Sequence, residues 1–397
     1  MKKYYLYFRI VIKAIISNII LHTVKCSLIS KDIWLFEEKP LEARDNAFYL
    51  YKYVKENHPE ICSYYVIRKG SPDIEKIKHY GTTINTGSLK HYIYWMAAKY
   101  SINSQQFGAA PYPTDVHYKL KRMCRKGQKT IFLQHGIIKD DMIGLHYERT
   151  RFDLFVCSAP REYEQIKDVF GYPPNKVKLL GMCRYDALKK NKEKTRNILV
   201  MPTYRVWMRP HKTYAEATQE EANKFRTSMF YNKYKDLLSN ETIINFLEFH
   251  NYKLVFYLHY SFQPYTRCFK ELENSTIIIA DRSHYDVQKL LINSDLLITD
   301  FSSVYFDYAY MEKPVVYYQF DEEEYRKKQY SNGYFSYSSD GFGPVYHKEN
   351  ELVAYIIDRI NNNCELEAKY LERVNKFFEI RDYKNCERNF NAIINLG

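Results

Sequence analysis

The stretch DLLITDFSSVYFDY, residues Asp295–Tyr308, decides the fold class of this chain. Its apolar run Leu296–Thr299 predicts a buried strand, and Val304–Met311 after it predicts a helix. Ser302 or Ser303 lies at the start of that helix, where a hydroxyl caps free backbone amides. The same amides form a binding site for anions such as phosphate. A strand that leads directly into such a helix indicates an α/β fold. The alternative interpretation is a capped helix without a ligand.

The same alternation of strands and helices extends in both directions along the chain. Further strands are expected at Ile33–Phe36, Ser63–Ile67, Thr130–Leu133, Leu154–Cys157, Val177–Leu180, Asn197–Met201, Lys253–Leu258, Thr276–Ile279 and Val315–Phe320. Further helices are expected at Asn46–Glu56, Tyr285–Leu291, Glu351–Asn361 and Glu365–Glu379. This alternation predicts parallel sheets built of βαβ units. Ligands of such sheets bind beyond the carboxyl ends of the strands.

The length of 397 residues suggests two domains. We interpret the lysine-rich segment Lys189–Arg196 as a linker and the polar segment His211–Asp236 as an insertion or lid. The expected parts are an amphipathic helix at residues 1–30, Rossmann-like domains at residues 31–190 and 191–375, and a helix at residues 376–397 that returns toward the first domain.

Charge and cysteine content narrow the function classes. Lysine and arginine number 59 against 47 acidic residues, which gives a net charge of +12. Such a field attracts polyanions, and nucleic acid, anionic lipid and a phosphate-rich polymer all qualify. The 8 cysteines show no C-x-x-C spacing, which favours reduced thiols in a cytosolic setting.

The N-terminal 30 residues are apolar but carry five lysine and arginine side chains. No uninterrupted apolar run reaches the roughly 18–20 residues of a membrane-spanning helix. Val11, Ile15 and Ile19 recur at helical spacing, which favours an amphipathic helix that lies in a membrane interface. The alternative is a first helix that packs on the protein's own core.

The first candidate for catalysis is His135, which follows the strand Thr130–Leu133 and precedes Gly136. Histidine has an ordinary pKa near 6.5 and suits proton transfer at neutral pH. Glycine allows close approach of a ligand to the backbone. The alternative is a structural histidine in a loop.

Further candidates follow the strands of the second half. Thr203 and Arg205 come after Asn197–Met201, and both side chains are able to hold phosphate oxygens. His259 follows Lys253–Leu258, where it would donate a hydrogen bond to phosphate or be a buried structural histidine. Asp300 would bind a ribose or order its turn.

Asp307 lies about one turn into the helix after Ser303 and would order that helix. The chain has neither G-x-G-x-x-G nor G-x-x-x-x-G-K-[ST], and it lacks H-E-x-x-H and G-x-S-x-G. The sequence therefore lacks the motifs that are typical of dinucleotide-dependent redox enzymes, P-loop hydrolases, zinc proteases and serine hydrolases.

An ordered set of segments resembles the CDP-glycerol glycerophosphotransferase family, which comprises teichoic-acid polymerases and related capsule enzymes. The segments are WLFE at residues 34–37, ARDN at 43–46, LQHG at 133–136, GMCRYD at 181–186, MPTYR at 201–205, ITDFSSVYFDYA at 298–309 and KPVVYYQFD at 313–321, with Tyr325, Gly333 and Gly343-Pro344 after them. The resemblance covers about residues 33–390. The family's familiar forms have Trp-His-Gly-Thr and His-Pro, whereas this chain has Gln134-His135-Gly136-Ile137 and His259-Tyr260.

The resemblance implies a GT-B-like fold with the donor in the C-terminal domain and a cleft between two sheets. It implies His135 as the base that deprotonates the acceptor hydroxyl and His259 as a second catalytic histidine. Arg205, Ser302 and Ser303 would bind phosphate, with Gly136, Thr203, Asp300 and Asp307 as further substrate-binding positions. No metal and no cofactor is implied.

The implied reaction is transfer of glycerol phosphate or ribitol phosphate from a CDP-activated donor, with release of CMP, to a lipid-linked or polymeric acceptor. The acceptor would be a teichoic-acid-like or capsular polymer. The enzyme would bind an anionic membrane at its cytoplasmic face as a peripheral protein, without a nucleic-acid partner. The first alternative is a GT-B glycosyltransferase that uses a nucleotide sugar. The second is a nucleic-acid-binding or membrane-binding protein without activity.

Overall fold

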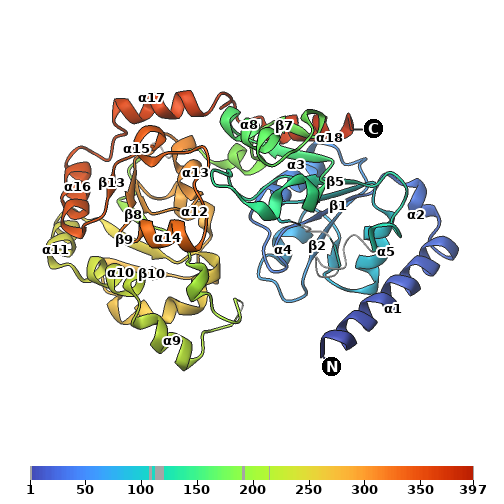
Figure 1. Ribbon diagram of the computed structural model, residues 1–397, viewed down its shortest axis with the longest axis horizontal. Helices are drawn as coiled ribbons and strands as arrows, with labels where there is room; N and C mark the ends of the chain where they lie inside the picture. Colours follow the sequence, from blue (N-terminus) through green and yellow to red (C-terminus); the bar gives the residue numbers. More distant parts are fainter. Residues whose placement is uncertain (1, 107–109, 112–119, 190–192, 214, 397) are drawn as a thin grey trace. The chain divides into compact units, whose positions relative to one another are not determined.

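The computed structural model describes residues 2–106, 110–111, 120–189, 193–213 and 215–396, and it divides into two compact units (Figure 1). Unit 1 comprises Met1–Ile137, Met142–Ala187 and Asp382–Gly397. Unit 2 comprises Ile138–Asp141 and Leu188–Arg381. The domain limits expected at residues 190 and 375 lie a few residues from these divisions. Residues 190–192 of the expected linker lie outside the described residues.

Unit 1 contains a seven-stranded parallel sheet in the order β3-β2-β1-β4-β5-β6-β7. Its strands are β1 (Trp34–Glu37), β2 (Ser63–Ile67), β3 (Thr83–Asn85), β4 (Tyr100–Asn103), β5 (Lys129–Phe132), β6 (Leu154–Cys157) and β7 (Val177–Leu179). Its helices are α1 (Lys2–Thr23), α2 (Ser27–Ser30), α3 (Asn46–Asn57), α4 (Ile74–Lys78), α5 (Leu89–Ala97), α7 (Tyr147–Thr150), α8 (Pro160–Asp168) and α18 (Asn385–Ile394).

Unit 2 contains a six-stranded parallel sheet in the order β10-β9-β8-β11-β12-β13. Its strands are β8 (Asn197–Val200), β9 (Lys253–Tyr257), β10 (Ile277–Ala280), β11 (Leu296–Thr299), β12 (Val315–Tyr318) and β13 (Val345–Tyr346). Its helices are α9 (Gln219–Arg226), α10 (Met229–Ser239), α11 (Glu241–Phe249), α12 (Val287–Ile292), α13 (Val304–Tyr310), α14 (Glu322–Lys328), α15 (Tyr337–Asp340), α16 (Glu349–Asn361) and α17 (Ala368–Phe377).

The two parallel sheets and the N-terminal helix confirm the expected α/β fold class. Every residue of β1, β4, β6, β11 and β12 is buried, as in sheets covered by helices on both faces. Both sheets share the Rossmann order 3-2-1-4-5-6, so the strand order reverses between β1 and β4 and between β8 and β11. Ligands of such sheets bind at this reversal. That the two sheets share one cleft stays a prediction.

The C-terminal residues complete the core of unit 1. In α18, Phe390 packs against Trp34 of β1 with ring centroids 5.5 Å apart, and it stacks on His58 at 3.7 Å. Asp186 accepts hydrogen bonds from the backbone N–H groups of Asn385 and Cys386, each at 2.8 Å. These bonds satisfy free amides at the start of α18 and fix the helix to the end of the segment at residues 181–186.

Helix α1 has one buried row and a wide exposed face. Ile10, Ala14 and Leu21 are buried in a cluster that includes Trp95 of α5, and α1 packs along α5 (Figure 1). The core-packing alternative for this helix is therefore observed for one of its faces. By length and composition, Tyr4–Thr23 would also be long enough to cross a membrane, with a mean hydropathy of 1.5.

Of the two interpretations of His211–Asp236, the lid is wrong for α9 and α10, and the insertion stays a prediction. Phe225 and Tyr234 are among the aromatic side chains of these helices that are buried in the core of unit 2. Thr218 and Ser228 begin the two helices as N-caps. Two short helices with a break between them give no single helical period, which explains why the sequence pattern was misleading.

Candidate active site

His135 lies at the carboxyl end of β5 and is exposed. The preceding residue, Gln134, has a left-handed backbone with φ of 61°. Asn46 stabilises this turn, because its side-chain amide donates to the carbonyl oxygens of Leu133 at 3.2 Å and Gln134 at 2.8 Å. Gly136 follows as a buried residue. The local fold therefore presents the imidazole from a turn that is fastened to α3.

Charged groups of unit 1 surround His135. Crowding by protein atoms desolvates the imidazole, although part of it is exposed, and this lowers the pKa of His135 below its ordinary 6.5. Asp45 opposes the shift, whereas Lys39 and Arg184 add to it. Arg184 is paired with Asp45 at 2.8 Å. The net result favours a neutral imidazole at neutral pH, which is the form that accepts a proton.

The segment GMCRYD at residues 181–186 supports this turn and does not extend the site. The backbone N–H of Arg184 donates to the Asn46 side-chain oxygen at 3.0 Å, so the segment orients the residue that holds the His135 turn. Asp186 caps α18 as described above. In the sequence, Asp45 and Asn46 stand out only as part of the ARDN segment. The structure gives that segment a physical role, because Asn46 donates to the turn and the charge of Asp45 acts on the pKa of His135.

In unit 2, three neighbouring strands bring the candidate residues to one sheet edge. His259 follows β9, Thr203 and Arg205 follow β8, and Asp300–Ser303 follows β11. These strands are consecutive in the order β9-β8-β11 and parallel, so their carboxyl ends meet at the same edge. The expected positions therefore gather at the strand-order reversal of this sheet.

Arg205 is fully buried and holds two carboxylates. Its guanidinium donates to Asp321 at 2.7 and 2.8 Å, to Asp300 at 2.9 Å and to the Thr203 carbonyl oxygen at 2.7 Å. The rings of Phe301 and Tyr325 lie within 5.3 and 5.1 Å of the guanidinium carbon. Burial lowers the pKa of Arg205, but the two aspartates outweigh it and the net shift is upward.

This arrangement gives Arg205 and Asp300 a structural role at the base of the site. Asp300, also fully buried, accepts from the backbone N–H of Thr203 at 2.8 Å as well as from Arg205. A donor phosphate would have to displace a carboxylate to reach the guanidinium, and a ribose would meet Asp300 only after a similar rearrangement. Asp321 was not singled out as a site residue from the sequence, although it ends the segment KPVVYYQFD that carries part of the resemblance. Direct ligand contact by Arg205 or Asp300 stays a prediction.

The accessible groups at this edge are His259, Tyr204 and the Ser302–Ser303 turn, all half-buried. His259 Nδ1 accepts from the backbone N–H of Ser261 at 3.1 Å. In the neutral ring, Nε2 therefore carries the proton and is the donor nitrogen. The His259 and Tyr204 rings stack with centroids 4.7 Å apart. Ser302 Oγ accepts from the backbone N–H of Val304 at 3.4 Å and orders the start of α13.

Thr203 and Asp307 lie deeper. The Thr203 hydroxyl is buried and has no hydrogen-bond partner within the described part of the chain. Asp307 is buried inside α13 with an exposed fraction of 3%. Among the described residues, no three His, Cys, Asp or Glu side chains are grouped so as to hold a metal ion. Chemistry without a metal or cofactor stays a prediction.

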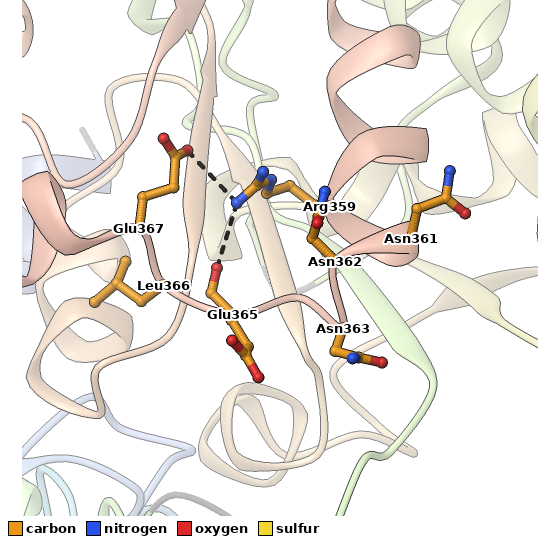
Figure 2. Close-up of a pocket in the computed structure, with 7 residues that line it drawn as sticks. All are labelled: Arg359, Asn361, Asn362, Asn363, Glu365, Leu366 and Glu367. Carbon is orange, nitrogen blue, oxygen red and sulfur yellow. Dashed lines mark hydrogen bonds and ion pairs between the residues drawn. The ribbon is translucent and has the colours of Figure 1, made fainter.

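A separate polar pocket lies at the end of α16 (Figure 2). It is lined by Arg359, Asn361, Asn362, Asn363, Glu365, Leu366 and Glu367. Lys194, which precedes β8, donates to the carbonyl oxygen of Asn363, so the pocket adjoins the amino edge of the sheet. The guanidinium of Arg359 in this pocket already pairs with Glu367 at 3.7 Å and donates to the Glu365 carbonyl oxygen at 3.5 Å. None of the candidate site residues expected from the sequence lines this pocket.

Comparison with known proteins agrees with these observations. The sequence model of the family described as CDP-Glycerol:Poly(glycerophosphate) glycerophosphotransferase matches residues 19–395. The chain is 34% identical over 97% of its length to the minor teichoic acid biosynthesis protein GgaB of Bacillus subtilis, and covers 42% of that protein. It is 25% identical over 87% of its length to the teichoic acid poly(glycerol phosphate) polymerase of Bacillus subtilis, and covers 46% of it. The chain thus spans less than half the length of these two relatives.

The fold is also similar to that of the wall teichoic acid polymerase TagF. The solved structure of one TagF variant matches 100% of this chain and 98% of its own, with a TM-score of 0.70 and 17% sequence identity. At this identity the likeness concerns the fold. It supports the assignment of both units to one known two-domain architecture.

Proposed function

Because the chain belongs to the CDP-glycerol:poly(glycerophosphate) glycerophosphotransferase family, we propose that it transfers a polyol-phosphate unit from a CDP-activated donor to a polymeric acceptor. The unit is glycerol phosphate or ribitol phosphate, the acceptor is a teichoic-acid-like or capsular polymer, and CMP is released. The observation that carries the proposal is the gathering of His259, Tyr204 and the Ser302–Ser303 turn at the strand-order reversal of unit 2. This is where a parallel α/β sheet binds a nucleotide.

In the proposed reaction, an acceptor hydroxyl attacks the β-phosphorus of the donor. A new P–O bond forms to the acceptor, the P–O bond to CMP breaks, and the hydroxyl proton moves to His135. The lowered pKa of His135 keeps this imidazole neutral and able to accept that proton. His259 would donate from Nε2 to a phosphate oxygen and offset the charge that develops in the transition state.

The buried Asp300–Arg205–Asp321 centre has a supporting role in this proposal. It links the segments after β8, β11 and β12 through charged hydrogen bonds. The Thr203 turn and the Ser302–Ser303 turn are therefore held in fixed positions before the donor binds. Such preorganisation reduces the reorganisation needed at the moment of reaction.

The proposal is tested by CMP release from a panel of CDP-polyols and nucleotide sugars with a polymeric acceptor. His135→Ala should lower CMP release by about 10²–10⁴-fold, the usual contribution of a general base. His79→Ala is a matched control, because His79 is an exposed histidine of the same unit at the end of α4. Undiminished turnover of His135→Ala would remove His135 from the mechanism. Release of a nucleoside diphosphate from a nucleotide sugar, with every CDP-polyol inert, would favour the glycosyltransferase alternative.

We also propose that the exposed face of α1 binds the cytoplasmic face of an anionic membrane. Tyr4, Phe8, Ile15 and Ile19 are 82%, 63%, 48% and 57% exposed and follow one another at helical spacing. The exposed Arg9 and the net charge of +12 would favour anionic lipid. This combination is typical of helices that lie in a membrane interface.

Sedimentation with phosphatidylglycerol vesicles tests the membrane proposal. Ile15→Glu with Ile19→Glu should remove roughly 2 kcal/mol of apolar burial, so binding should fall about 30-fold. Phe249→Glu serves as the control, because Phe249 is 82% exposed but lies in unit 2. Equal sedimentation of both variants and the unsubstituted chain would contradict a role for α1. Binding to phosphatidylcholine vesicles that matches binding to phosphatidylglycerol would contradict the charge contribution.

A further inference from the structure

His135 lies on a short strap whose two ends are held in different units. The strap is residues 134–141, of which Ile138–Asp141 belongs to unit 2, whereas residues up to Ile137 and from Met142 belong to unit 1. At its first end, Asn46 holds the carbonyl oxygens of Leu133 and Gln134. The candidate base is thus three residues from a segment that packs in the unit with the donor-binding edge.

The second end is fixed by a partly buried ion pair. Asp140 is 7% exposed and accepts from Arg326 Nη1 at 2.8 Å, and the buried ammonium of Lys139 also contacts Asp140. The Arg326 guanidinium carbon lies 5.6, 5.7 and 5.9 Å from the ring centroids of Phe301, Tyr325 and Tyr337. The pair is therefore enclosed by protein atoms. Removing Asp140 would leave two enclosed cations, Lys139 and Arg326, without their shared carboxylate, whereas removing Arg326 would take one of its two cations from Asp140.

Gly333 closes over the same segment. A Cβ atom at this position would lie 2.0 Å from the Lys139 carbonyl oxygen and 2.9 Å from the Asp140 Cα. Real side chains do not approach backbone atoms this closely, so only glycine fits without displacing the strap. This contact is independent of charge and gives a second way to disturb the same segment.

The anchor is continuous with the buried centre of the donor-binding edge. Phe301 and Tyr325, which cover Arg326, are stacked on each other at 3.9 Å and also cover Arg205. Phe301 directly follows Asp300, the partner of Arg205. Between Gln134 and Ile138 only three residues intervene, and each residue spans at most about 3.3–3.6 Å. Displacement of the anchored end therefore passes to His135 through very little chain.

We propose that Asp140 and Arg326 are positioning residues for His135, acting through the backbone of the strap. The proposal rests on the proposed function, in which His135 is the base. It expects that Arg326→Gln and Asp140→Asn each lower kcat for CMP release by about 10- to 100-fold, the usual effect of misplacing a reacting group by about 1 Å. The KM for the CDP-polyol should stay within about twofold, because neither residue binds the donor. Arg326→Lys should retain more activity than Arg326→Gln, since it keeps the charge opposite Asp140.

Gly333→Ala should reproduce this split between kcat and KM without changing any charge. Gly144→Ala is the matched control, because the nearest atom to a Cβ there is 4.0 Å away. Hydrogen exchange of the peptide covering residues 134–142 supplies a readout that needs no activity. It should accelerate in Arg326→Gln and in Gly333→Ala but not in Gly144→Ala, while the peptide containing His259 is unchanged.

Three results would overturn the proposal. The first is a variant whose strap exchanges faster but whose kcat is unchanged. The second is unchanged hydrogen exchange of the strap in both Arg326→Gln and Gly333→Ala. The third is a large rise in the KM for the donor without a fall in kcat. The third result would make Arg326 a donor ligand instead. A wild-type chain that releases no CMP from any donor contradicts the proposed function alone, and the exchange measurement then decides whether the anchor exists.

Discussion

Arg205→Met separates the structural role of Arg205 from the phosphate-binding role expected from the sequence. Methionine keeps much of the side-chain volume but removes the positive charge and every hydrogen-bond donor. Asp300 and Asp321, with side-chain exposures of 0% and 3%, would then be buried carboxylates without their cation. If Arg205 were instead an exposed residue that only binds phosphate, its replacement would leave no buried carboxylate unpaired.

The expected cost follows from this burial. Removal of one partner from a buried ion pair costs about 3–5 kcal/mol, because the remaining charge is uncompensated. The whole free energy of unfolding of a domain is about 5–15 kcal/mol. Unit 2 should therefore lose a large share of its stability and unfold at a much lower urea concentration. A surface substitution, by contrast, would change the free energy of unfolding by about 0.5 kcal/mol or less.

Urea unfolding followed by tryptophan fluorescence measures this loss, because Trp207 lies in unit 2 two residues from Arg205. In the variant, burial raises the pKa of the unpaired carboxylates above the unfolded value of about 3.9. The folded variant then binds more protons than the unfolded chain, so its stability falls as pH rises through the raised pKa. The deficit against wild type should be smaller at pH 5 than at pH 8. Asp300→Asn and Asp321→Asn added to Arg205→Met should recover part of it.

An unchanged urea midpoint for Arg205→Met would refute the buried-centre interpretation. If donor KM then rose more than tenfold, Arg205 would be the phosphate ligand that the resemblance implies. A loss of stability that is the same at pH 5 and pH 8 would show that lost packing, and not an uncompensated charge, is the cause.

Two further predictions concern unit 1. The acid limb of kcat/KM should have its midpoint below pH 6.5, because activity is lost as pH falls through the lowered pKa of His135. Asp45→Asn should move that midpoint lower and Arg184→Gln should move it higher, so shifts in the same direction would contradict the assignment of His135. Asp186→Ala should cost about 1–2 kcal/mol, since it removes the cap of α18. Faster hydrogen exchange confined to α18 would support this, and unchanged exchange there would contradict it.

Local patterns were sufficient to predict most of the elements. Each strand expected from an apolar run is present within two residues of its expected limits, because burial on both faces requires continuous apolar residues. The central strand Tyr100–Asn103 was missed, since its Ser101 and Asn103 are polar. Both are buried, and Asn103 donates to the Ile131 carbonyl oxygen of β5 at 3.3 Å, a partner that only tertiary structure supplies.

The sequence by itself determined the α/β class, the family and the positions where strands end, because these depend on neighbouring residues and on their order. The tertiary structure decided what each polar side chain meets. Arg205 finds carboxylates 95 and 116 residues further along the chain, and no local pattern contains that information. His135 is held by Asn46, 88 residues from the Gln134 carbonyl oxygen to which it donates. Residue type determines which charges and hydrogen-bonding groups a side chain has. Long-range packing determines whether those groups bond to other residues of the protein or face a substrate.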